Sequence, residues 1–317
     1  MSRRILYIGA PEADAGRFAE RVHVDFKDVD LVATNDREVA LRHVPQAEAI
    51  IGHHFQFDED LLSSATALRW IQSLTTGTDA ILKLKSLRSN VMVTSTRGMH
   101  GPQMSELVFL QMLALLRDFP RMLRNQQSGT WERWPQPLLF GKTVGIVGVG
   151  AIAEALAPRC NAFGMRVIGV STSTRLPAGF DAMVGRQDLE QVAATVDFLV
   201  LIVPYSASTE SLVGARVLGA MKPGAFLINV ARGGVLDEEA LLAALRSGRL
   251  GGAALDVFRQ TPLPADDPLW REPRLIVTPQ IGGMSDIYLE QAYPVVRKNL
   301  EAFLADRLDE MVNLVAH

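Results

Sequence analysis

The sequence lacks the features of several protein classes. Only one of its 317 residues is a cysteine, Cys160, so neither an intramolecular disulfide nor a cysteine-based metal cluster can form. The longest apolar run, residues 107–116, is interrupted by Gln111 and is about half as long as a membrane-spanning helix. The net charge is only -3, so there is no basic excess of the kind that binds nucleic acid or anionic lipid. We therefore expect a cytoplasmic protein that binds small molecules, with no metal, nucleic acid or membrane as a partner.

The residues that are present indicate a two-domain globular protein. The chain is 48% hydrophobic and 21% charged, which is ordinary for a folded protein. Its length exceeds what one hydrophobic core normally supports. Short apolar segments alternate with helical patterns through nearly the whole chain. This alternation predicts an α/β fold with two doubly wound parallel sheets, each covered by helices on both faces.

The order of the apolar segments predicts the domain organisation. In the first hundred residues a helix is expected at 39–43, and strands are expected at 4–8, 49–52, 70–73 and 91–94. The strands expected later are 143–147, 165–170, 198–203, 225–230, 252–255 and 275–277. A final helix at 286–304 would return the chain to the first domain. The predicted domains are therefore a discontinuous first domain of residues 1–100 and 285–317 and a second domain of residues 101–284.

Two further segments lie between these strands. Residues 105–117 form a helical pattern whose apolar stripe consists of Leu107, Leu110, Gln111 and Leu115, and we expect it to pack between domains or subunits. Residues 130–140 contain two tryptophans and two prolines, which are typical of an ordered loop.

A glycine-rich turn predicts a dinucleotide site. After the apolar segment 143–147, the sequence Gly148-Val149-Gly150-Ala151-Ile152-Ala153 precedes a helical pattern. In such a Gly-x-Gly-x-x-Ala turn, Gly148 permits a sharp turn, Gly150 permits backbone to approach a diphosphate, and Ala153 permits close helix packing. The N–H groups at the helix start, beside Ala151 and Ile152, would bind the anion.

The segment after the next strand bears on which dinucleotide is bound. An NAD site usually has an acid about 20 residues past the turn, where it binds the ribose hydroxyls. This chain has hydroxyl side chains there, including Ser171 and Thr172, followed by Arg175. These groups would bind a 2′-phosphate, so we predict NADP in preference to NAD. The alternative interpretation is an exposed polar loop with Arg175 in solvent.

Five ordered motifs together resemble a known family. They are residues 141–150, Val203-Pro204 with Thr209, residues 229–237, residues 254–258 and residues 278–283. The chain resembles the D-isomer-specific 2-hydroxyacid dehydrogenases over nearly its whole length, and especially their glyoxylate and hydroxypyruvate reductase branch. The resemblance implies a flavodoxin-like substrate domain, a Rossmann cofactor domain, an active-site cleft between them and a homodimer.

The resemblance also implies roles for individual residues. Arg232 matches the arginine that binds the substrate carboxylate and carbonyl, a task that suits a planar guanidinium. Gly77 and Thr78 match the carboxylate-binding loop, although valine is more usual at position 78. Cofactor contacts are implied for Val203, Pro204, Ala231, Asp256 and Gly282.

The sequence departs from the family at the proton-handling pair. The family uses a histidine that a glutamate orients, and this chain has Gln280 and Thr261 at those positions. A histidine both gives and takes a proton near neutrality. An amide can donate a hydrogen bond and polarise a substrate, but it cannot supply the proton.

Three interpretations follow from this departure. In the first, the protein transfers hydride between a nicotinamide and a small 2-oxo or 2-hydroxy acid or a related carboxylate, and His53, His54, His100 or water replaces the missing acid. In the second, the reaction needs no proton from position 280, so the substrate is not an ordinary 2-hydroxy acid. In the third, the protein binds NAD(P) as a sensor or interaction partner with little or no turnover. We expect an oxidoreductase, with the third interpretation as the alternative.

Overall fold

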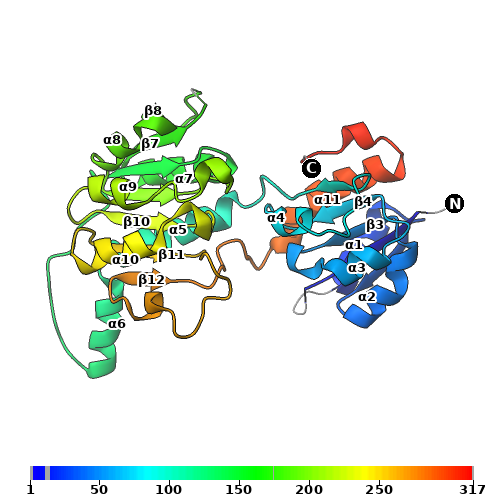
Figure 1. Ribbon diagram of the computed structural model, residues 1–317, viewed down its shortest axis with the longest axis horizontal. Coiled ribbons are helices and arrows are strands. Elements are labelled where there is room, and N and C mark those ends of the chain that lie inside the picture. Colours follow the sequence, from blue (N-terminus) through cyan, green and yellow to red (C-terminus); the bar gives the residue numbers. More distant parts are fainter. Residues whose placement is uncertain (1–2, 11–14, 174, 316–317) are drawn as a thin grey trace. The chain divides into compact units, whose positions relative to one another are not determined.

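The computed structural model describes residues 3–10, 15–173 and 175–315, and it divides into two compact units (Figure 1). Unit 1 consists of Met1–Met99 and Asp286–His317, and unit 2 consists of His100–Ser285. Thr174, one of the hydroxyl residues after the turn, lies outside the described residues.

Within the described residues, unit 1 contains a parallel five-stranded sheet in the order β2-β1-β3-β4-β5. This is a flavodoxin-like order. Its strands are β1 (Arg4–Ile8), β2 (Asp30–Thr34), β3 (Ala49–Gly52), β4 (Trp70–Ser73) and β5 (Met92–Thr94). Its helices are α1 (Ala15–Asp25), α2 (Arg37–His43), α3 (Glu59–Ser64), α4 (Asp79–Leu82) and α11 (Tyr288–Leu304).

Both faces of the unit 1 sheet are buried. Ile5 and Tyr7 of β1 belong to a core that also includes side chains of α1 and α11, whereas Leu6 and Ile8 belong to a second core with α2 and α3. Successive side chains of a strand point to opposite faces, so a continuous apolar strand requires both cores. The C-terminal helix α11 therefore completes one face of a sheet built by the first hundred residues.

Unit 2 contains a larger parallel sheet. Its described strands follow the order β12-β11-β10-β9-β6-β7-β8, a doubly wound arrangement of the Rossmann type. They are β6 (Thr143–Val147), β7 (Arg166–Ser171), β8 (Ala182–Gly185), β9 (Phe198–Leu201), β10 (Phe226–Asn229), β11 (Gly252–Leu255) and β12 (Leu275–Val277). The helices are α5 (Gly101–Leu116), α6 (Phe119–Ser128), α7 (Ala151–Ala162), α8 (Leu189–Ala193), α9 (Ala215–Ala220) and α10 (Glu238–Arg246). The predicted α/β fold class is confirmed.

The elements that the sequence did not predict have weak apolar signals. Strands β2 and β8 lie at the edges of their sheets and are mostly only half-buried, so neither shows the continuous apolar run of a central strand. Helix α6 has no buried residue. The conformation of such elements depends more on their neighbours in the fold than on the apolar pattern of their own sequence.

The apolar stripe predicted on the helix at 105–117 is buried only in part, since Leu107 and Gln111 are buried. Leu110, which was assigned to the stripe, is 59% exposed, whereas Met104, Val108 and Met112 are buried. Helix α5 packs against α7, β10 and β11 inside unit 2. Because it is covered on most sides, its apolar residues do not form a single stripe.

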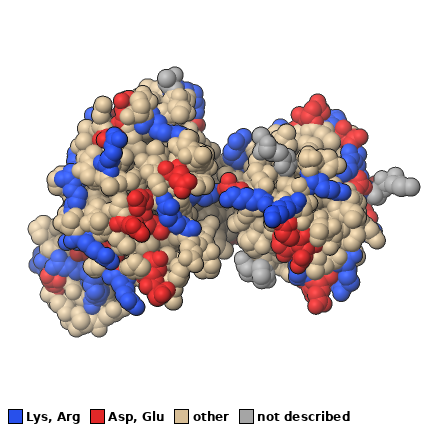
Figure 2. Space-filling view, in the orientation of Figure 1, with Lys and Arg blue, Asp and Glu red and all other residues tan. Residues whose placement is uncertain are grey.

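The described surface carries charges of both signs. Acidic and basic side chains are interspersed on the face shown in Figure 2. In the described part of the chain, no helix combines the length and the apolar character needed to cross a membrane. No group of three histidine, cysteine, aspartate or glutamate side chains among residues 3–10, 15–173 and 175–315 is arranged to hold a metal ion.

Candidate active site

The turn after β6 requires glycine at its first position. Gly148 has a φ of 96°, and a Cβ built there would lie 2.6 Å from the backbone Cα and N of Val203. A side chain at position 148 would therefore be strained and would clash with the segment that follows β9. The close approach places the β6 turn beside Val203 and Pro204.

The second glycine of the turn borders open space. A Cβ on Gly150 would have no heavy atom within 4 Å, and Gly150 is the N-cap of α7 without a side-chain hydrogen bond to the helix. Ala153 is fully buried, which lets α7 pack closely on the sheet. The backbone at Gly150 thus borders open space at the start of α7, and Ala151 and Ile152 are the first residues of that helix. This geometry fits the diphosphate of a dinucleotide.

The segment after β7 is polar, but its arginine has a partner. The Ser171 hydroxyl accepts a hydrogen bond from Ser173 N at 3.1 Å, and the Ser173 hydroxyl accepts one from Arg175 N at 3.2 Å. Thr172 and Arg175 are exposed. The Arg175 guanidinium forms an ion pair with Glu154 of the first turn of α7. The Arg175 side chain is still 65% exposed, so the alternative of an exposed polar loop with Arg175 in solvent stays open beside the 2′-phosphate prediction.

Arg232 follows β10 in extended conformation. Its Nη1 donates to the carbonyl of Ala231 at 2.7 Å, and Asn229 Nδ2 donates to the carbonyl of Arg232 at 3.2 Å. Ala231 is buried, and its N–H donates to Asn229 Oδ1 at 3.0 Å. These bonds hold the backbone of Ala231 and Arg232, from which the half-buried Arg232 side chain extends.

Asp256 holds the loop that follows β12. Its carboxylate accepts hydrogen bonds from the Thr278 hydroxyl at 2.6 Å and from Ile281 N and Gly282 N, each at 3.1 Å. Burial, with the side chain only 2% exposed, raises the pKa of Asp256, and these hydrogen bonds oppose the shift. Gln111 of α5 extends the network by donating to Thr278 at 3.3 Å.

The same loop carries Gln280 and Gly282. Gln280 is exposed and has a φ of 57°, in the left-handed region that is uncommon for a residue other than glycine. A Cβ on Gly282 would lie 2.5 Å from Leu107 Cδ2, so glycine is needed there for packing. Thr261 is exposed. Position 280 is therefore presented by a loop that Asp256 and α5 constrain.

His100, at the start of α5, lies within electrostatic range of Arg232. Burial lowers the pKa of His100 to about 4, and the positive charge of Arg232 contributes to the shift. Gly283 is a further neighbour, since a Cβ there would lie 3.6 Å from the His100 ring. His100 is therefore a neutral imidazole near pH 7.

The parallel topology of unit 2 brings these residues to one edge of the sheet. Gly148, Ser171, Arg232, Asp256 and Gln280 all follow carboxyl ends of parallel strands. The order of the strands reverses between β6 and β9, so Ser171 lies on one side of this switch point and Arg232 lies on the other. Dinucleotides bind across such a switch point in doubly wound sheets.

The candidate residues of unit 1 also follow strand ends. His53 follows β3, and its ring contacts Phe55 and Tyr288 with centroid distances of 5.3 Å each. His54 is half-buried at the start of the next turn. After β4, the Thr75 hydroxyl donates to the carbonyl of Gly77 at 3.0 Å, and Thr78 is buried at the start of α4.

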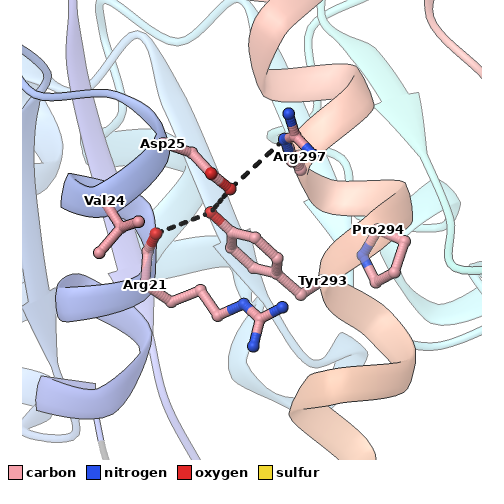
Figure 3. Close-up of a pocket in the computed structure, with 6 residues that line it drawn as sticks. All are labelled: Arg21, Val24, Asp25, Tyr293, Pro294 and Arg297. Atoms are coloured by element: carbon pink, nitrogen blue, oxygen red, sulfur yellow. Dashed lines mark hydrogen bonds and ion pairs between the residues drawn. The ribbon is translucent and has the colours of Figure 1, made fainter.

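Unit 1 has a hollow of about 360 Å³ between α1 and α11 (Figure 3). There the Tyr293 hydroxyl donates to Asp25 at 2.9 Å, Arg297 pairs with Asp25 at 3.3 Å, and the Arg21 guanidinium lies 4.7 Å from the Tyr293 ring centroid. Since these groups satisfy one another, we assign them to holding α1 on α11.

Comparison with known proteins identifies the family. The model of the D-isomer-specific 2-hydroxyacid dehydrogenase NAD-binding domain matches residues 109–282. A glyoxylate reductase of Thermococcus litoralis is 34% identical over 278 residues, covering 84% of this chain and 83% of its own. The chain belongs to the D-isomer-specific 2-hydroxyacid dehydrogenase family. It is thus an oxidoreductase of a family that uses a nicotinamide dinucleotide.

Other known proteins are similar to this chain over nearly its whole length. A glycerate dehydrogenase of Methylorubrum extorquens is 29% identical and covers 98% of this chain and 99% of its own. A family member from Aeromonas salmonicida has a solved structure with a TM-score of 0.91 and 33% identity, covering 100% of this chain and 99% of that one. Another solved structure, an acyclic imino acid reductase bound to NADPH and D-Arg, has a TM-score of 0.82 and 25% identity, covering 99% and 100%. The recognised family and the expected oxidoreductase class are confirmed, and the sensor interpretation is not favoured.

Sequence analysis missed two parts of this dehydrogenase site. Glu154, the partner of Arg175, lies one residue past the glycine-rich turn, and the contact depends on the pairing of β6 with β7. In the sequence, Thr278 is only a residue of the last motif, and Gln111 is only a member of the apolar stripe. Their contact with Asp256 depends on the packing of α5, which no local pattern reveals.

Proposed function

We propose that the protein transfers a hydride from NADPH to C2 of a small 2-oxo acid or a related carboxylate. The observation that carries this proposal is the alignment of the glycine-rich turn, Arg232 and the Gln280 loop along the carboxyl edge of one sheet. The family membership supplies the reaction class.

The residues around the switch point have distinct roles in this proposal. Backbone N–H groups at Gly150, Ala151 and Ile152 bind the diphosphate. When bound, the nicotinamide supplies the hydride. The residues proposed to border its half of the dinucleotide are Val203, Pro204, Ala231, Asp256 and Gly282. Asp256 acts there by fixing the loop that it anchors.

Substrate binding is assigned to the Arg232 side chain and to a loop of unit 1. Arg232 binds the carboxylate through charge-assisted hydrogen bonds, which fixes the orientation of C2. Gly77 and Thr78 of unit 1 are proposed as further carboxylate ligands on the basis of the family resemblance. Gln280 hydrogen-bonds the atom attached to C2, and Thr261 takes the position of the lost glutamate.

The group attached to C2 is either oxygen or nitrogen. The absence of histidine at position 280 permits a substrate that needs no proton from that position. One similar solved structure is that of an acyclic imino acid reductase, so reduction of a C=N bond is the second candidate.

The proposed reaction is tested by mixing the protein with NADPH or NADH and a panel of small 2-oxo acids, each with and without an added amine. Loss of nicotinamide absorbance that depends on the acid supports the proposal. Tight cofactor binding without oxidation under any of these conditions would favour a sensor.

NADP is the proposed cofactor, and Glu154 is expected to influence the choice. Arg175→Ala is expected to weaken NADPH binding about tenfold more than NADH binding, since it removes one charged contact to the 2′-phosphate, worth about 1.4 kcal/mol. Glu154→Gln should strengthen NADPH binding because it frees the guanidinium. Fluorescence titration measures both effects.

Arg166 provides the control for this prediction. It is exposed at the opposite end of β7, so Arg166→Ala should leave the ratio of the two affinities unchanged. An equal loss of both cofactors in Arg175→Ala would refute the 2′-phosphate assignment.

The proposed oligomer is a homodimer, as the family resemblance implies. Helix α6 and the segment after it expose large apolar side chains, led by Trp131 at 94%. The others are Phe119, Leu123, Leu138 and Phe140. Such a patch favours association. Light scattering is expected to give twice the monomer mass, and Trp131→Ser should shift the protein toward monomer, whereas a monomeric native protein would contradict the proposal.

A further inference from the structure

Reduction of a ketone requires a proton as well as a hydride. Hydride addition to C=O leaves negative charge on oxygen, and a positioned acid normally contributes 10²–10⁴-fold to the rate by protonating it. Gln280 has no dissociable proton near neutral pH, and the hydroxyl of Thr261 is not an acid in that range. The usual position of the acid is therefore occupied by a side chain that forms hydrogen bonds only.

Two titratable groups at this edge of unit 2, His100 and Asp256, are poorly suited to replace the missing acid. His100 is buried beside Arg232, and with a pKa of about 4 it is protonated in about one molecule in a thousand at pH 7. Asp256 is committed to Thr278, Ile281 and Gly282 as an acceptor. Neither group is a ready source of a proton.

We propose that the preferred substrate is the iminium form of a small 2-oxo acid, in which an amine nitrogen replaces the carbonyl oxygen at C2. This inference rests on the proposed function, and it names the substrate class. Arg232 would bind the carboxylate, and the nitrogen would lie toward Gln280.

The chemistry of an iminium matches the side chains present. The nitrogen already carries its proton and a positive charge before hydride arrives. The hydride forms the new C2–H bond, the C=N π bond breaks, and its electron pair becomes the lone pair of the nitrogen, while NADPH becomes NADP⁺. The product amine is neutral when it forms and takes up a proton from water afterwards. No acid is needed in the hydride-transfer step.

Glutamine also suits an iminium better than histidine does. A protonated histidine would repel the cation and offers only hydrogen-bond donors. The Gln280 amide is neutral, and its oxygen can accept a hydrogen bond from the iminium N–H. With histidine absent, a glutamate at position 261 has no ring to orient. The paired change to Gln280 and Thr261 thus removes a positive charge and its partner together.

The test compares three probes with NADPH: pyruvate alone, pyruvate with methylamine, and the preformed cyclic imine Δ1-piperideine-2-carboxylate. We expect kcat/KM for the cyclic imine to exceed that for pyruvate at least a hundredfold. Mass spectrometry should identify N-methylalanine, with little lactate, when methylamine is present.

The outcomes separate this inference from the proposed function. Conversion of pyruvate to lactate at a rate that methylamine does not change, with the cyclic imine left unreduced, overturns the iminium inference and leaves the proposed function in place. Failure to bind NADPH overturns the proposed function, and NADPH binding without oxidation by any probe overturns both.

Variants test the role of position 280. Gln280→Leu keeps the approximate size but removes the acceptor, so kcat/KM for the cyclic imine should fall about tenfold. Gln280→His combined with Thr261→Glu restores the acid and its orienting group, and should shift the ratio of lactate to N-methylalanine at least tenfold toward lactate. Gln191→His, on the exposed face of α8, is the matched control and should leave that ratio unchanged. An unchanged ratio in the folded double variant overturns the inference.

Discussion

Arg232→Ala is expected to lower kcat/KM for the carboxylate substrate about a thousandfold, which corresponds to about 4 kcal/mol of transition-state stabilisation. The magnitude follows from the loss of two charge-assisted hydrogen bonds, each worth about 2 kcal/mol. NADPH affinity should change little, because the diphosphate is bound at the other side of the β6–β9 switch point. Initial-rate kinetics and NADPH titration measure the two effects separately.

Two variants serve as controls for this prediction. Arg216→Ala removes an arginine of α9 whose side chain is 84% exposed, and it should leave kcat/KM unchanged. Arg232→Lys keeps the charge but loses the planar fork, and it should recover only part of the activity. A folded Arg232→Ala protein with native kinetics would show that another group binds the carboxylate.

The same variant has a second expected signature. Because the charge of Arg232 helps to lower the pKa of His100, its removal should raise that pKa from about 4 toward the ordinary value. Burial is the larger cause, so the shift should be incomplete. An NMR titration of the His100 ring would detect it.

Central strands were the most predictable part of the fold. β1, β3, β4, β6 and β11 have the predicted bounds, because a strand buried on both faces is a continuous apolar run. The half-buried edge strand β12 also has the predicted bounds. The edge strands β2 and β8 and the polar helix α6 were missed, since their partly exposed residues do not carry that signal. The apolar stripe assigned to α5 describes its burial only in part, because burial on several sides obscures the helical period.

The candidate site was predictable as far as local motifs extend. The turn at Gly148 and Gly150 could be found from the sequence because its glycines follow a fixed spacing. The structure shows that a side chain at position 148 would clash with Val203. The ion pair between Glu154 and Arg175 joins separate elements, and so does the network from Gln111 to Asp256. Contacts of this kind depend on packing between segments distant in sequence, so a single sequence does not contain a local signal for them.

The central claim is that backbone N–H groups at the glycine-opened start of α7 bind the dinucleotide diphosphate. Gly150→Asp tests it, because an added side chain at this extended position has no protein atom within 4 Å to clash with and the chain should still fold. Gly219→Asp is the matched control, since Gly219 is also open to added atoms but lies on the exposed face of α9.

The decisive measurement is calorimetric titration of NADPH into the native protein and both variants. We expect native and Gly219→Asp proteins to bind alike, and Gly150→Asp to lose at least about a hundredfold in affinity, or about 3 kcal/mol, because its carboxylate meets the diphosphate. Equal NADPH affinity in folded Gly150→Asp protein, or no binding of any nicotinamide cofactor by the native protein, would contradict the account.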